Sequence, residues 1–153
     1  MDDFAYTSQM RTKAAWEAGR LAEEVVPVSI KTRKGTTEFT RDEHPKPNTT
    51  VETLAGLKSA FKEDGVVTAG NASGISDGAG ALVVASATKA KALGLRPIGR
   101  LVAWGVAGVD PTIMGIGPAP AARKALKKAG MPLDQIDLVE INEAFAAQYL
   151  AVE

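Results

Sequence analysis

Asn142 follows a short apolar segment, residues 138–141, and stands directly before a second apolar stretch that starts at Glu143. This order predicts a buried strand that ends at Asn142 and is followed by a helix, and strand ends are where α/β proteins place chemistry. An asparagine amide donates and accepts hydrogen bonds without titrating, so it could hold a water molecule or a substrate carbonyl oxygen. Local features favour a second interpretation, a helix cap, because Asn is a preferred N-cap residue and Glu143 suits a first turn.

A glycine-rich passage, residues 68–80, precedes a continuous apolar run at 81–85. A dinucleotide fingerprint has a strand before its glycines and a helix after them, and a Walker loop has Gly-Lys-Ser/Thr, so neither phosphate loop fits. Small residues let a backbone approach a ligand or another chain closely, and Ser73 could hydrogen-bond a ligand amide. Tight turns between packed elements explain the same glycines equally well.

His44 is the single histidine, and its proline-rich polar loop favours a surface position over the role of a catalytic base. The chain contains no cysteine, which excludes a disulfide, a thiolate metal site and a cysteine nucleophile within it. Met114, Phe61 and Phe145 could line an apolar pocket, although such residues more often serve in packing. The basic face at 123–128 is most simply a solvated helix face.

Bulk composition narrows the class of protein. Eighteen basic residues balance eighteen acidic ones, which argues against nucleic-acid binding by bulk electrostatics. The apolar stretches are shorter than a membrane span requires, and the first residues lack the pattern of a signal peptide. These features predict a globular protein of the cytoplasm, or of the mitochondrial matrix in a eukaryote, that is not secreted.

Hydrophobic periodicity and turn signals predict both helices and strands. The predicted helices cover residues 4–24, 51–58, 87–93, 119–129 and the stretch from Glu143, with a cap at Asp3 and a capping box between Thr49 and Glu52. The predicted strands cover residues 25–30, 36–40, 81–85, 97–106 and 136–141, the first two as a hairpin that turns at Lys34-Gly35, and a further turn is expected at Asp64-Gly65. The β-α-β-α order of the second half favours an α/β sheet with helical crossovers.

Three segments, taken in this order, resemble the thiolases, acyltransferases that cleave or form 3-ketoacyl-CoA. They are Thr-Ala-Gly-Asn-Ala-Ser-Gly-Ile-Ser-Asp-Gly-Ala-Gly at 68–80, Asp-Pro-Thr-Ile-Met-Gly-Ile-Gly-Pro at 110–118 and Asn-Glu-Ala-Phe at 142–145. Residues 42–50 and 148–153 add to a likeness that covers essentially the whole chain and points to the 3-ketoacyl-CoA thiolase and acetyl-CoA acetyltransferase group. It implies an α/β chain that is an incomplete part of the thiolase fold, with its layers and mixed five-stranded sheets.

The resemblance also implies a division of the chain. Residues 1–70 match the end of the loop domain that covers CoA, residues 71–96 match the last part of the N-terminal half, and residues 97–153 match the start of the C-terminal half. The family's nucleophilic cysteine is then expected before Met1, and its histidine motif and second cysteine are expected after Glu153.

Individual residues take roles from the same resemblance. Asn142 matches the asparagine that positions a water in the oxyanion hole, and Ser73 matches a serine that contacts the pantetheine of CoA. Apolar residues of the pantetheine tunnel are matched by Phe61, Met114 and Phe145. Lys46 and Thr49 match positions at the nucleotide end of CoA, where the family often has Arg in place of Lys46; lysine keeps the charge but not the planar fork.

The implied reaction is acyl transfer between an acyl thioester and acetyl-CoA or CoA, by thiolytic cleavage or formation of 3-ketoacyl-CoA. CoA is a substrate, no metal or prosthetic group is implied, and the intact parent is expected to be a homodimer or homotetramer without nucleic-acid or membrane partners. Without the cysteines and the histidine, this chain is expected to be inactive alone. The alternatives are a non-catalytic CoA-binding or interaction module, and a truncated gene product without an independent role.

Overall fold

A computed structural model describes residues 1–153. The chain divides into two compact units, which are described separately below. The first unit comprises Met1–Gly74 and Glu143–Leu150, and the second comprises Ile75–Asn142 and Ala151–Glu153. None of the helices has the length and apolar character needed to cross a membrane.

The first unit begins with helix α1, Asp2–Glu17, which is followed by a single 3₁₀ turn, η1, at Ala22–Glu24. The helix predicted over 4–24 therefore starts earlier and is interrupted, and its N-cap is Met1 instead of Asp3. The interruption falls where Gly19 takes a left-handed backbone conformation with φ of 71°, which ends the regular helical hydrogen bonding.

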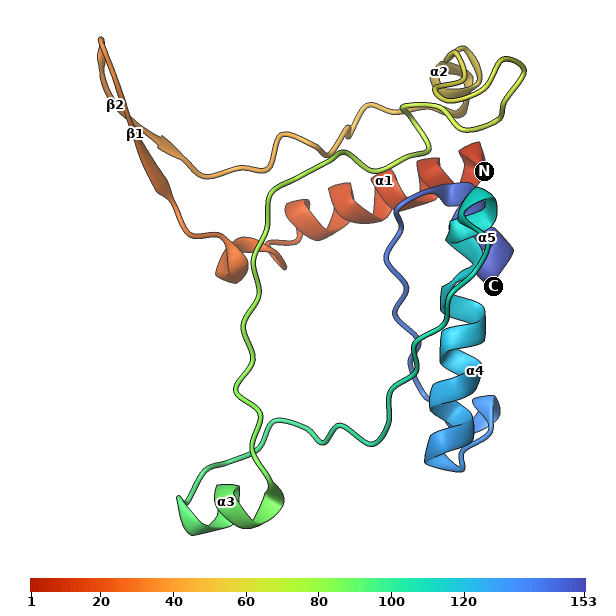
Figure 1. Ribbon diagram of the computed structural model, residues 1–153. Coiled ribbons are helices and arrows are strands. Elements are labelled where there is room, and N and C mark those ends of the chain that lie inside the picture. The colour runs from red at the N-terminus through yellow and green to blue at the C-terminus, as the bar shows by residue number, and fades with distance from the viewer. The chain divides into compact units, whose positions relative to one another are not determined.

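Strands β1, Val28–Thr32, and β2, Gly35–Phe39, form an antiparallel hairpin (Figure 1). The register places Val28 opposite Phe39 and Thr32 opposite Gly35. The turn between the strands needs a glycine, because Gly35 has φ of 125°. The predicted hairpin is thus confirmed, with its first strand beginning three residues later than expected.

Helix α2, Val51–Ala55, occupies the start of the segment predicted as a helix over 51–58. Its cap is a reciprocal pair: the backbone N–H of Thr53 donates to Oγ1 of Thr50 at 3.2 Å, and the N–H of Thr50 donates to Oγ1 of Thr53 at 3.0 Å. The predicted box of Thr49 and Glu52 is therefore wrong by one residue, because the extended residue that ends the preceding loop is Thr50.

The longest helix of the second unit is α4, which lies between shorter elements in the chain. In chain order these are α3 at Ala87–Ala92, η2 at Pro111–Ile116, α4 at Pro118–Ala129 and η3 at Leu133–Gln135, while α5, Ala146–Val152, begins in the first unit. The helices predicted over 87–93 and 119–129 are confirmed. Gly130 ends α4 in a left-handed conformation with φ of 66°, as the stop signal predicts.

Three predicted strands, at 81–85, 97–106 and 136–141, are not formed, since the hairpin β1–β2 is the whole of the sheet structure. Extended chain runs on both sides of α3 without a partner (Figure 1). Each of the three predicted strands has an apolar side chain that is open to solvent: Val83 is 97% exposed, Ile98 100% and Leu138 90%. A strand is stable only when its backbone groups pair with a neighbour, so apolar content alone does not produce one.

Two lysines of α4 hold the extended segment that precedes it in the chain. Nζ of Lys124 donates to the carbonyl of Val106 at 3.0 Å, and Nζ of Lys128 donates to that of Trp104 at 3.1 Å while lying 5.3 Å from the centroid of the Trp104 ring. A β-carbon on Gly105 would lie 2.9 Å from the amide nitrogen of Ala125. The basic face of α4 is therefore not simply solvated, as the sequence suggested, because two of its cations bind backbone.

Replacing Gly105 by Val is expected to separate this segment from α4, because the helix backbone already occupies the space of the new side chain. The indole N–H resonance of Trp104 should then shift in a ¹⁵N–¹H correlation spectrum, as its Lys128 contact is lost. Gly108→Val is the matched control, since nothing lies within 4 Å of a β-carbon there. An indole resonance of Trp104 that is the same in both variants would contradict the packing.

Candidate functional site

Two segments that are far apart in the sequence pair within the first unit. Ala72 and Phe145 form an antiparallel bridge, the N–H of Ser73 donates to the carbonyl of Ala144 at 2.9 Å, and the N–H of Ala146 donates to the carbonyl of Asn71 at 2.9 Å. Residues 71–73 therefore lie alongside residues 144–146, which places Ser73 beside the residue next to Phe145. Two of the residues predicted for the site are brought together in this way.

Asn71 fixes the turn that precedes Ser73. Its side chain is buried, and Oδ1 accepts a hydrogen bond from the N–H of Thr68 at 2.8 Å. Nδ2 donates to Oδ1 of Asp2 at 2.9 Å and to the carbonyl of Val66 at 3.1 Å. A buried amide with both of its ends satisfied gives the backbone around it a defined conformation. The sequence singled out Ser73 and missed this neighbour.

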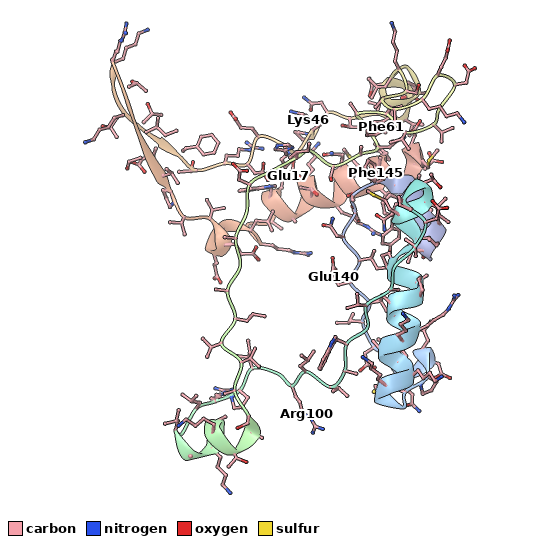
Figure 2. The ribbon with its side chains drawn as sticks, in the orientation of Figure 1. Glu17, Lys46, Phe61, Arg100, Glu140 and Phe145 are labelled. Carbon is pink, nitrogen blue, oxygen red and sulfur yellow. The ribbon has the colours of Figure 1, made fainter.

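The aromatic rings of Phe61 and Phe145 meet edge to face, with centroids 5.9 Å apart and planes at 78° (Figure 2). Phe61 stands on a turn that is closed by a hydrogen bond from the N–H of Ala60 to the carbonyl of Val67, at 2.8 Å, and that contains the predicted Asp64-Gly65 bend. Phe61 keeps 75% of its surface exposed, whereas Phe145 is half-buried. The pair thus leaves an open aromatic face on the segment that pairs with residues 71–73.

Lys46 and Thr49 lie on a braced loop, residues 42–50. The N–H of Lys46 donates to Oε1 of Gln9 on α1 at 2.8 Å, and the Thr49 hydroxyl donates to the carbonyl of Lys46 at 2.8 Å. The Lys46 ammonium donates to the carbonyl of Glu43 at 3.1 Å, so its charge has no carboxylate as an acceptor there. An anionic group of a ligand could replace that neutral acceptor.

His44, on the same loop, covers the backbone of Gly74. A β-carbon on Gly74 would lie 2.5 Å from Nδ1 of His44 and still closer to Cε1. The surface position expected for His44 is confirmed by its exposure, but its ring also contacts the residue after Ser73. Ser73, Phe61, Phe145 and the loop of Lys46 and Thr49 therefore belong to one connected part of the first unit.

Met114 belongs to the second unit, on η2, and is 68% exposed. The turn is capped by Asp110, whose Oδ1 accepts hydrogen bonds from the hydroxyl of Thr112 at 2.7 Å and from its N–H at 2.8 Å. These bonds, the hydroxyl first, lower the pKa of Asp110. The aspartate is thus kept ionised as the cap of the turn that carries Met114.

Asn142, the last residue of the second unit before the chain passes into the first, is exposed. The expected helix cap is not formed there, because α5 begins only at Ala146, after residues that pair with the segment of Ser73. Glu143 likewise does not enter a first helical turn; its Oε2 accepts a hydrogen bond from the hydroxyl of Ser8 at 2.6 Å. The amide of Asn142 is left available for another role.

A cavity of about 260 Å³ between α1 and the loop before α2 was not anticipated from the sequence. It is lined by Gln9, Lys13, Trp16, Glu17, Arg41, Pro45, Pro47 and Asn48. Arg41 lies over the ring of Trp16, with 6.0 Å from its Cζ to the centroid. Three of the lining residues, Gln9, Lys13 and Trp16, are spaced four and three residues apart and so lie on one helix face. This spacing is the feature of the sequence that could have predicted one wall of the cavity.

Comparison with known proteins identifies the family. Residues 1–88 match the family model described as thiolase, N-terminal domain, and residues 95–153 match the one described as thiolase, C-terminal domain. The first match alone covers more than half of the chain. This chain belongs to the thiolase family, and the resemblance drawn from its three motifs is confirmed.

Comparison with individual proteins also places this chain among the thiolases. The mitochondrial 3-ketoacyl-CoA thiolase of Bos taurus is 55% identical over 152 residues, which are 99% of this chain and 38% of that protein. The crystal structure of the Bacillus anthracis acetyl-CoA acetyltransferase matches with a TM-score of 0.87 at 55% identity, over 99% of this chain and 38% of that one. Human mitochondrial 3-ketoacyl-CoA thiolase in complex with CoA matches with a TM-score of 0.82 at 52% identity, over 99% and 37%.

The predicted fold is confirmed by these structures: this chain has an incomplete α/β thiolase fold, and it spans 38% of the length of the Bos taurus relative. The finer division at residues 70 and 96 stays a prediction, as do the individual roles of the seven site residues.

Proposed function

We propose that this chain supplies the CoA-contacting part of a thiolase, an acyltransferase that moves an acyl group between an acyl thioester and the thiol of CoA. The observation that carries the proposal is the pairing of residues 71–73 with residues 144–146, which brings the segment of Ser73 alongside that of Phe145, whose ring meets Phe61. The likeness to a solved thiolase in complex with CoA supports the choice of ligand.

The pantetheine arm of CoA has amides separated by apolar carbon atoms, and the site offers a partner for each. The exposed hydroxyl of Ser73 can accept from or donate to an amide. The open face of Phe61, supported by Phe145, suits the apolar stretches between the amides. The same apolar role is proposed for Met114, a flexible side chain on η2, from the family resemblance alone.

The nucleotide end of CoA carries phosphates, for which Lys46 provides the charge and Thr49 a hydroxyl. The ammonium of Lys46 now donates to a carbonyl oxygen, and exchanging that acceptor for a phosphate oxygen gives a stronger, charge-assisted hydrogen bond. Lysine acts there as a point charge without the stacking plane that arginine has. The nucleotide is therefore held by charge more than by shape.

Asn142 is proposed to act in the chemical step. In thiolytic cleavage, a cysteine thiolate bonds to the 3-keto carbon, the bond between C2 and C3 breaks, and its electron pair moves onto the thioester oxygen as an enolate that is then protonated at C2. The acyl group on the cysteine passes to the thiol of CoA, which frees the cysteine. A water molecule can donate one hydrogen bond to the amide oxygen of Asn142. Its second hydrogen can then be donated to the thioester oxygen as negative charge develops there. One such donor is worth roughly 10²–10³ in rate. Because this chain contains no cysteine, it is not expected to transfer acyl groups alone.

Calorimetric titration of the chain with CoA tests the proposal. Saturable binding is expected, and Ser73→Trp should abolish it, because a bulky ring replaces the hydroxyl at the proposed contact with CoA. Ser29→Trp is the matched control, since Ser29 stands on the exposed hairpin. A chain that melts cooperatively but binds no CoA would contradict the proposal. The parent assembly is proposed to be a homodimer or homotetramer, which sedimentation of the full-length protein would test.

A non-catalytic CoA-binding module is the second candidate, favoured by the fact that five of the seven site residues lie in the first unit. The two functions differ when the chain is placed in a thiolase that supplies the missing residues. CoA binding without any turnover there would favour the module, whereas turnover would favour the enzyme.

A further inference from the structure

We propose that His44 is a positioning residue of the CoA site. Its ring holds the loop that carries Lys46 and Thr49 at a fixed distance from Ser73, so that the two ends of one CoA molecule can be bound together. This inference rests on the proposed function.

The ring of His44 lies against the backbone of Gly74. The imidazole of His44 fills the space that a side chain at position 74 would take, with Nδ1 2.5 Å and Nε2 3.3 Å from where the β-carbon of that side chain would be. The backbone of Gly74 is not in the left-handed region, since its φ is outside the positive range that favours glycine. Glycine is thus needed here for space and not for its backbone angle.

Hydrogen bonds to neighbouring groups hold both partners of this contact in place. The N–H of His44 donates to Oδ1 of Asp42 at 2.9 Å, and the N–H of Lys46 donates to Gln9 of α1 at 2.8 Å. On the opposite side, the N–H of Ser73 donates to the carbonyl of Ala144 at 2.9 Å. The ring of His44 therefore acts as a spacer between two braced segments.

CoA is long and flexible, and binding its second end is an intramolecular event whose strength depends on how well the two subsites are spaced. Subsites that are already correctly placed also avoid the entropy of ordering them on binding. A residue that only sets the spacing should therefore affect intact CoA much more than either half of the molecule.

The test measures the affinity of the full chain for CoA, for pantetheine and for adenosine 3′,5′-bisphosphate. His44→Ala is expected to weaken CoA about tenfold and to leave each half nearly unchanged, because only the linkage of the two ends is lost. His44→Phe, which keeps a planar ring, should retain most of the CoA affinity. A role in folding alone would instead lower the affinity for all three ligands together.

The contact is tested by a cycle of substitutions. Gly74→Ala should weaken CoA because the new methyl group displaces the ring, and adding His44→Ala should return the affinity to that of His44→Ala alone. Gly78→Ala is the matched control, since nothing lies within 4 Å of a β-carbon there. Should Gly74→Ala unfold the first unit, the comparison of His44→Ala with His44→Phe decides the question.

The outcomes separate this inference from the proposed function. Ser73-dependent CoA binding that is unchanged in His44→Ala would overturn the positioning role and leave the CoA site standing. Equal losses for CoA and for both halves, or no recovery with Phe, would also overturn it. Absence of CoA binding by the folded wild-type chain would overturn the proposed function first, and the inference with it.

Discussion

Asn71→Asp is expected to destabilise the first unit by about 3 kcal/mol, because it places a buried carboxylate against another acidic group. In the wild type, Nδ2 of Asn71 donates to Oδ1 of Asp2 and to the carbonyl of Val66. In the variant, an oxygen without a hydrogen faces both of these acceptors at hydrogen-bond distance. The bond from Thr68 alone is retained.

Amide hydrogen exchange measures the loss, since the N–H of Ala146 is bonded to the carbonyl of Asn71 and reports on the pairing beside Ser73. Exchange at Ala146 should accelerate on the order of 100-fold, and CoA affinity should fall with it. Asn48→Asp, at an exposed position, is the matched control for the exchange of Ala146 only, since Asn48 lies on the loop of Lys46 and Thr49.

A second substitution makes the prediction specific. Adding Asp2→Asn to Asn71→Asp restores an amide-to-carboxylate hydrogen bond in the reverse direction, so part of the protection at Ala146 should return. Recovery is partial because the carbonyl of Val66 still faces an oxygen. If Asn71→Asp leaves the exchange of Ala146 unchanged, the buried network does not support the site.

Asn142→Ala is expected to lower kcat by roughly 10²–10³-fold with little change in KM, because the water that Asn142 is proposed to hold contributes to the transition state and not to substrate binding. The measurement requires a chain with a nucleophile. Residues 1–153 can replace the matching segment of the Bacillus anthracis acetyl-CoA acetyltransferase, to which they are 55% identical. Thiolysis is then followed by the loss of the 3-ketoacyl thioester.

Asn142→Asp provides the comparison for this chimera. An aspartate keeps the shape and an oxygen that can accept from the water, but its charge opposes the negative charge that develops on the thioester oxygen. Its kcat should therefore fall at least as far as that of the alanine variant. A wild-type kcat in either variant would remove Asn142 from the mechanism, while a change confined to KM would assign it to binding alone.

The sequence predicted well those elements whose contacts are local. The hairpin follows from β-branched residues around Lys34-Gly35, and α4 follows from its periodic alanines and leucine between Pro118 and Gly130. The cap of α2 was placed one residue early, because Thr49 and Thr50 are equally good caps and the loop geometry decides between them.

Contacts between distant residues were not predictable in the same way. The bond from Asn71 to Asp2 joins residues 69 positions apart, and no local pattern connects them. The run at 81–85 has the composition of a covered strand, but a strand also needs a partner that its own residues do not supply. The candidate site could be predicted only because three separate motifs occur in the order typical of one family, and periodicity or charge does not predict it.

The thiolysis rate of the chimera most directly tests the claim that this chain supplies the CoA-contacting part of a thiolase. A functional segment predicts a kcat within about tenfold of the Bacillus anthracis parent, given the typical cost of imperfectly placed groups. Ser73→Trp in the chimera should abolish CoA-dependent turnover. A chimera that melts like its parent but shows no turnover, or whose turnover is unaffected by Ser73→Trp, would contradict the claim.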